Sequence, residues 1–241
     1  HGTFAKKVYK GSIVDGGLVL RAVSPDGEDG FPGNLELTVR YTLTDENALV
    51  LDYTATTDAP TIINLTNHSY FNLEGQSSGS MLEQTLCLNA STFTEGNAET
   101  CPTGRILPVA GTPMDFTRAK PIGRDIQAEY SQLQMCGGYD HNFILDKEPG
   151  MLALAAVARS EKTGITMETY TTQPGVQLYT SNSLQNDTRP GKTGGIYGRY
   201  QGFCLETQHY PCTPSHPEFP SVELRPGEEY HETTIYKFLT E

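Results

Sequence analysis

Residues 64–75 (NLTNHSYFNLEG) contain the side chains best suited to chemistry on a sugar. A β-branched run over residues 61–65 predicts a strand that ends shortly before His68. An imidazole has a reference pKa of about 6.5, so it can give or take a proton near neutral pH. The neighbouring Asn and Ser side chains can bind hydroxyl groups, and Tyr70 and Phe71 offer rings for stacking. The segment predicts a sugar site with a proton-transferring histidine, the alternative being a histidine satisfied by its neighbours in the core or a loop.

Glu206 is the second candidate, because it interrupts an otherwise apolar strand that begins with residues 202–205 (GFCL). A carboxylate that is partly buried has a raised pKa and is a better base than an exposed one. The alternation of a strand also permits a plainer arrangement, with Phe203 and Leu205 facing the core and Glu206 facing solvent. The residues alone leave both interpretations open.

Two polar residues could complete such a site. Asp140 follows a Gly137-Gly138-Tyr139 turn that could direct its carboxylate into a cleft, although an aspartate there could equally hold only the loop. Gln177 lies in a stretch rich in Thr, Gln and Tyr, where its amide can donate to and accept from hydroxyl groups. A plain position on the strand surface is the alternative for Gln177.

Four separate segments resemble, in the same order, the signatures of the aldose 1-epimerase (galactose mutarotase) family: residues 66–73 (TNHSYFNL), 138–143 (GYDHNF), 173–180 (QPGVQLYT) and 202–208 (GFCLETQ). The resemblance implies the interconversion of the α and β anomers of aldohexoses such as galactose and glucose, without a cofactor. It implies that Glu206 removes the proton of the anomeric hydroxyl and that His68 protonates the ring oxygen. Asp140 and Gln177 would then bind the sugar.

The start of the chain departs from the family pattern. His1-Gly2-Thr3-Phe4 resembles a remnant of the family's His-Gly-Gly element, which would make His1 a sugar ligand, but the second glycine is absent and a tag residue is the alternative. The family's upstream Asn-Arg pair has no counterpart. We therefore expect residues 1–241 to form one mutarotase-like domain that lacks its N-terminal strands.

Strand patterns dominate the rest of the chain. Alternation predicts a hairpin from residues 35–43 and 48–55, a second from 151–158 and 165–170, and a last strand over 232–238. Residues 122–133 predict the one short helix. Many short strands punctuated by Gly and Pro predict an all-β protein, and the resemblance implies a large twisted antiparallel β-sandwich.

Composition narrows the possible partners. The net charge of −12 argues against nucleic acid and anionic membranes, and no apolar run approaches the ~20 residues of a membrane helix. The five cysteines predict free thiols in a reducing compartment, the cytoplasm, and Cys204 looks like a small strand hydrophobe without an activating neighbour. The histidine spacing fits no metal site, so we expect a protein that binds a small sugar without a metal. We expect it to be a monomer or a homodimer.

Three other functions stay open. A non-catalytic carbohydrate-binding sandwich would need neither His68 nor Glu206. A hexose-phosphate epimerase would need basic residues for the phosphate, and none of the 17 Lys and Arg residues lies in the four segments. A glycosidase could use Glu206 and Asp140 as its pair of carboxylates.

Overall fold

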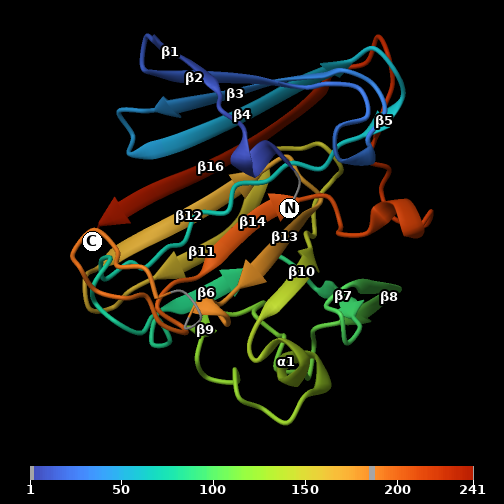
Figure 1. The fold of residues 1–241 in the computed structure, drawn as a ribbon. Helices are drawn as coiled ribbons and strands as arrows, with labels where there is room; N and C mark the ends of the chain where they lie inside the picture. The colour runs from blue at the N-terminus through green and yellow to red at the C-terminus, as the bar shows by residue number, and fades with distance from the viewer. Residues whose placement is uncertain (1–2, 185–187, 241) are drawn as a thin grey trace.

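A computed structural model describes residues 3–184 and 188–240, and in it the chain is almost entirely β (Figure 1). Among these residues the larger antiparallel sheet has nine strands, in the order β1 (Lys10–Val14), β2 (Gly17–Ser24), β3 (Leu35–Leu43), β4 (Ala48–Thr57), β16 (Tyr230–Thr240), β12 (Ile165–Thr171), β11 (Ala153–Arg159), β6 (Thr85–Leu88) and β9 (Lys120–Pro121). The all-β prediction is confirmed.

A smaller sheet packs beneath the larger one. Its five strands lie in the order β14 (Cys204–Gln208), β13 (Gly175–Tyr179), β10 (Asp140–Ile144), β7 (Thr92–Gly96) and β8 (Pro102–Pro108). A separate pair joins β15 (Glu223–Leu224) to β5 (Thr61–Ile62). The short helices are η1 (Thr3–Lys6), η2 (Glu28–Gly30), α1 (Ser131–Cys136) and η4 (Thr213–Ser215). None of the described helices has the length and apolar character needed to cross a membrane.

Both predicted hairpins and the last strand are confirmed. In the first hairpin, Leu35, Leu37 and Val39 of β3 are buried while Glu36 between them is exposed, as the alternating sequence requires. The second hairpin pairs β11 with β12 and contains a bulge between Leu154 and Ala156.

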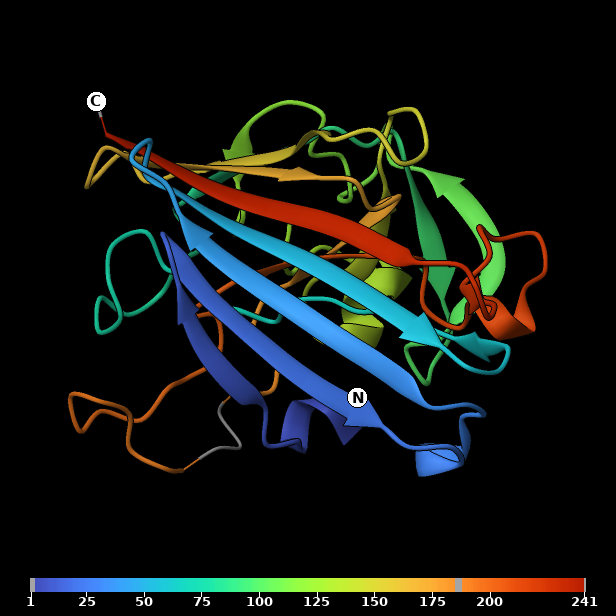
Figure 2. The same cartoon turned by 90° about the horizontal axis from the view of Figure 1, so that it is seen from above.

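The strand β16 lies in the middle of the larger sheet. It pairs with β4 on one side and with β12 on the other, as Figure 2 shows in red between cyan and gold. Tyr236 of this strand is buried, and its hydroxyl donates to the carbonyl oxygen of Leu205 in β14 at 2.9 Å. This bond ties the centre of the larger sheet to the smaller sheet.

Aromatic side chains fill the space between the sheets. The rings of Phe71 and Tyr236 lie 4.9 Å apart, and those of Phe116 and Tyr139 lie 5.0 Å apart in an edge-to-face arrangement. Such rings bury large apolar areas and have preferred mutual geometries. They give the smaller sheet a rigid support on its core side.

Two predictions of local structure are wrong. Residues 122–130 do not form the predicted helix, because turns such as Arg124 N–H to the Pro121 carbonyl bring Ile122 and Ile126 into the core. Of the predicted range only residues 131–133 are helical, as the start of α1. The strand predicted over 61–65 stops at Ile62. Beyond it, the Asn64 side chain bonds both the N–H and the carbonyl of His209, and this takes the place of strand pairing.

Candidate active site

The register of the smaller sheet places its polar side chains on one face. Gln177 of β13 stands directly opposite Glu206 of β14, and Tyr179 stands opposite both Asp140 of β10 and Cys204 of β14. Side chains that are opposite each other, or two positions apart on one strand, project to the same side of a sheet. The five side chains therefore share the face that is turned away from the aromatic core.

A polar cavity of about 620 Å³ lies over this face. His68, Asp140, Gln177 and Glu206, the four described residues predicted to form the site, all line it. His1, the fifth predicted residue, lies outside the described residues. Other residues at the cavity wall are Tyr70, Thr100, Met135, Cys136, Tyr179, Asn182, Ser183, Gln208 and Pro211.

Glu206 is almost completely buried, with 6% of its surface exposed. Burial, followed by the nearby Asp140 carboxylate, raises the pKa of Glu206 to about 8. One carboxylate oxygen, Oε1, lies 3.4 Å from Nε2 of His68. A carboxyl group with a raised pKa thus faces an imidazole in the same cavity.

Asp140 and Gln177 form a hydrogen-bonded pair. The Gln177 amide donates to Asp140 Oδ1 at 2.7 Å, while its own oxygen accepts from Gln208 at 3.4 Å. Burial raises the pKa of Asp140, and the Gln177 bond and the nearby His68 partly offset that rise. These hydrogen bonds hold an acceptor and a donor in fixed positions beside Glu206, which suits the binding of sugar hydroxyls.

The segment before Phe71 holds His68 over the sheet. Phe71 and Phe203 exchange two backbone hydrogen bonds of 2.8 and 2.9 Å, which dock this segment against the start of β14. The rings of Tyr70 and Tyr179 lie 5.0 and 5.9 Å from the imidazole. His68 is therefore held between aromatic neighbours with its Nε2 directed at Glu206.

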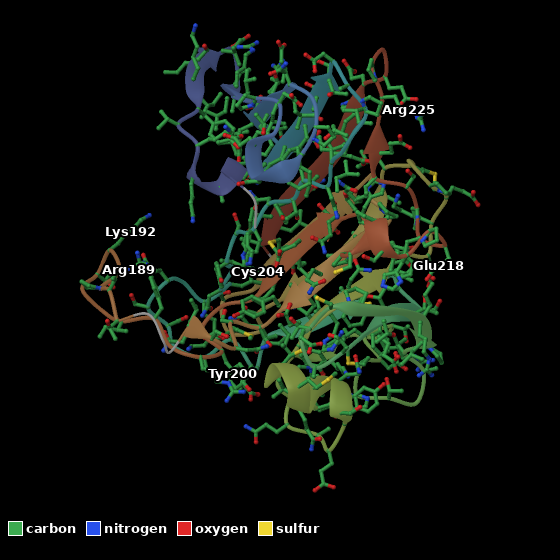
Figure 3. The ribbon with its side chains drawn as sticks, turned by 45° about the vertical axis from the view of Figure 1, so that its right-hand side comes forward. Arg189, Lys192, Tyr200, Cys204, Glu218 and Arg225 are labelled. Carbon is green, nitrogen blue, oxygen red and sulfur yellow. The ribbon has the colours of Figure 1, made fainter. Side chains whose placement is uncertain are left out.

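Cys204 has a histidine neighbour that its local sequence did not indicate. Its Sγ lies 3.4 Å from Nδ1 of His68, and Figure 3 shows Cys204 in the interior of the molecule. A thiol can donate to a bare ring nitrogen, and a sulfur can accept weakly from a protonated one. Either bond orients the ring. Cys204 is a buried strand residue, as expected, but the expectation that no histidine lies beside it is wrong.

His68, Cys204 and Glu206 are also the described residues that could hold a metal ion, since one ligand atom from each lies within 4.8 Å of the others. A cysteine binds metal as the thiolate. Burial, followed by the Glu206 and Asp140 charges, raises the pKa of Cys204 and keeps it protonated. A bound metal would have to displace this proton, and in the structure the three side chains are linked by the Cys204–His68 contact and the His68–Glu206 pair.

Tyr179 and Gln208 were not singled out from the sequence, although both line the cavity. Each lies two positions from a residue that was singled out, Gln177 in β13 and Glu206 in β14. The two-residue period of a strand would have found them.

Gly138 lies in the turn that directly precedes β10. Its φ is 144°, and a Cβ there would collide with Asn182 Oδ1 and lie 2.8 Å from Thr180 Oγ1. We expect Gly138→Ala to lower the free energy of unfolding by about 2–4 kcal/mol through steric strain at a buried turn. Urea unfolding measures this.

Gly150→Ala is the matched control. It also has a positive φ, of 71°, but no atom lies within 4 Å of its Cβ position, so we expect a loss of only about 1 kcal/mol. Equal losses in the two variants would show that backbone conformation, and not the close packing at Gly138, sets the effect.

Comparison with known proteins gives concordant matches. The family model described as aldose 1-epimerase matches residues 1–237. The chain is 42% identical over 237 residues to a human protein named galactose mutarotase. The match covers 98% of this chain and 66% of the human protein. The chain is 39% identical over 220 residues to the Escherichia coli aldose 1-epimerase, covering 90% of this chain and 62% of that one. The chain thus spans just under two thirds of the length of these relatives.

A solved structure agrees with these matches. The GalM/aldose epimerase homologue from Caenorhabditis elegans superimposes with a TM-score of 0.86 at 30% identity, covering 97% of this chain and 69% of that chain.

Proposed function

The chain belongs to the aldose 1-epimerase family, and we propose that it interconverts the α and β anomers of aldohexoses such as galactose and glucose. One observation carries the proposal: a buried carboxyl group and an imidazole lie 3.4 Å apart over a polar cavity. The hydroxyl and the ring oxygen of an anomeric centre are attached to the same carbon. A base and an acid that lie close together therefore match the two atoms that must exchange protons.

The reaction opens the sugar ring first. Glu206, as the carboxylate, takes the proton of the anomeric hydroxyl, while His68, protonated on Nε2, gives a proton to the ring oxygen. The bond between the anomeric carbon and the ring oxygen breaks, and the anomeric carbon becomes an aldehyde. The pKa of about 8 makes the Glu206 carboxylate a strong base, and the fraction of Glu206 present as carboxylate rises as the pH approaches 8.

The ring then closes on the other face. The bond next to the aldehyde carbon rotates, the ring hydroxyl returns its proton to His68, and Glu206 protonates the new anomeric oxygen. Asp140 and Gln177 would hold the remaining hydroxyls during the rotation, since their bond fixes both side chains at the cavity wall. Both catalytic groups end in their starting protonation states.

The cavity favours a neutral sugar over a sugar phosphate. The described residues that line it include neither lysine nor arginine. Figure 3 shows Arg189 and Lys192 on a loop at the periphery, away from Cys204. A phosphate group would lack the positively charged partners that it requires in a binding site.

We propose that the protein works in the cytoplasm, because the five cysteines are free thiols.

Polarimetry tests the proposed function. Freshly dissolved α-D-glucose or α-D-galactose should reach its equilibrium rotation faster in the presence of the protein, and the comparison ranks the two sugars. A free aldose has no glycosidic bond, so a glycosidase would give no signal in this assay. A folded sample that leaves both rates at the spontaneous value would favour the carbohydrate-binding interpretation.

A further inference from the structure

Two cysteines lie beside the sugar cavity on different loops, and we propose that Cys101 and Cys212 form a site of reversible oxidation that closes to a disulfide. Cys101 immediately precedes β8, and Cys212 immediately precedes η4. The residues before them, Thr100 and Pro211, both line the cavity. The pair thus lies where these two loops meet at the cavity wall.

The backbone at both cysteines is fixed by local hydrogen bonds. Cys101 N–H donates to Asn97 Oδ1 at 3.0 Å, and Asn97 N–H donates to the Cys101 carbonyl at 2.8 Å. The Cys212 carbonyl accepts from Ser215 N–H at 2.9 Å. Little chain entropy is left to lose when the two side chains are joined.

A second set of contacts holds the two loops together. His216 Nε2 lies 3.0 Å from the carbonyl oxygen of Pro102, the residue after Cys101. The Cβ position of Gly104 lies 2.8 Å from both His216 Nδ1 and Glu218 Oε1, so the strand and the loop are in close contact. Figure 3 shows Glu218 at the surface of the molecule.

The two thiols are exposed and contact each other. Burial, followed by the hydrogen bond with Cys101, raises the pKa of the Cys212 thiol. The other three cysteines differ, since Cys204 is buried and Cys87 and Cys136 are partly buried. A thiol pair that is accessible and already in contact meets the first requirement for a disulfide.

The chemistry requires a two-electron oxidant, for which we name hydrogen peroxide. Cys101 can attack first as its thiolate, the form of a cysteine that reacts with a peroxide. The O–O bond breaks, giving a sulfenic acid at Cys101 and one water. The Cys212 sulfur then attacks the Cys101 sulfur, the S–S bond forms, and a second water leaves. Two thiols lose two hydrogen atoms, and the peroxide is reduced to two waters.

Peptide mapping tests the proposal on the full chain. The protein is treated with hydrogen peroxide, the remaining thiols are alkylated, and the digest is analysed without reductant. We expect one crosslinked peptide pair joining Cys101 to Cys212, lighter than the sum of its parts by two hydrogen atoms. Dithiothreitol should restore both alkylation sites.

Three variants sharpen the experiment. Cys101→Ser and Cys212→Ser should each abolish the crosslink, while the matched control Cys87→Ser should keep it. Oxidation should also raise the melting temperature of the wild-type protein and of Cys87→Ser alone, because a bond between positions 101 and 212 constrains the unfolded chain. Sulfinic or sulfonic acids at either cysteine without a crosslink, or crosslinks only between molecules, would overturn the proposal. No readout uses mutarotation, so the proposed function can fail independently.

Discussion

Glutamine in place of Glu206 should reduce the mutarotation rate by a factor of about 10³ or more while the protein stays folded. The amide has nearly the same shape but cannot accept the proton of the anomeric hydroxyl, and a positioned base contributes roughly 10²–10⁴-fold to a rate. The loss should appear in kcat, because the amide can still bind a hydroxyl group. Polarimetry across sugar concentrations separates kcat from KM. The exposed Glu99 provides a matched control, and Glu99→Gln should retain full activity.

The same substitution should make the fold more stable at high pH. Glu206 titrates at about 8 in the folded protein, against 4.5 for an ordinary glutamate. As pH rises from about 4.5 to 8, the unfolded chain loses this proton while the folded protein keeps it, so the free energy of unfolding of the wild-type protein falls. Glu206→Gln has no proton to lose at this position, so its free energy of unfolding does not fall for this reason. The difference in unfolding free energy should grow to about 4 kcal/mol by pH 8.

Urea unfolding of both proteins at pH 5 and pH 8 measures this difference. A difference that does not change with pH would show that Glu206 has an ordinary pKa. Active Glu206→Gln protein would separately remove Glu206 from the proposed mechanism.

Replacement of His68 by alanine should slow mutarotation by about 10²–10⁴-fold, because the departing ring oxygen then receives no proton. About a third of the His68 side chain is exposed to the cavity (32%), so added imidazole can enter the space that it leaves. We expect imidazole to restore part of the rate in His68→Ala. His231→Ala, at an exposed position of β16, should neither lose activity nor respond to imidazole.

Wild-type activity in His68→Ala would exclude His68 as the acid. A large loss without rescue, in a folded protein, would assign His68 to binding or positioning.

The strands were predictable where one face is buried and the other is not. Leu35, Leu37 and Val39 alternate with polar residues, and hydrophobic periodicity detects such a pattern directly. The helix predicted over residues 122–133 begins only at Ser131, because successive turns bury Ile122 and Ile126 instead. Local sequence cannot separate a helix from such turns, since the choice depends on contacts elsewhere in the chain.

The sequence pointed to the residues that we propose for the site, but it did not indicate the contacts between their side chains. Each of His68, Asp140, Gln177 and Glu206 belongs to a recognisable segment, and all four line one cavity. The contact of Cys204 with His68 spans 136 residues of chain and arises only when the segment before Phe71 docks on β14. The raised pKa of Glu206 likewise follows from burial in three dimensions, which no local pattern reports.

The central position of β16 has a consequence for how the protein is made. Among the described strands, β4 and β12 are joined only through residues 230–240. While a ribosome is still adding the preceding residues, a nascent chain can form the β1–β4 meander, but the meander ends in an open edge. Open edges of this kind invite pairing with other chains. Completion of the sheet therefore waits until residues 230–240 have been made, and until then the β4 edge stays open to pairing with other chains.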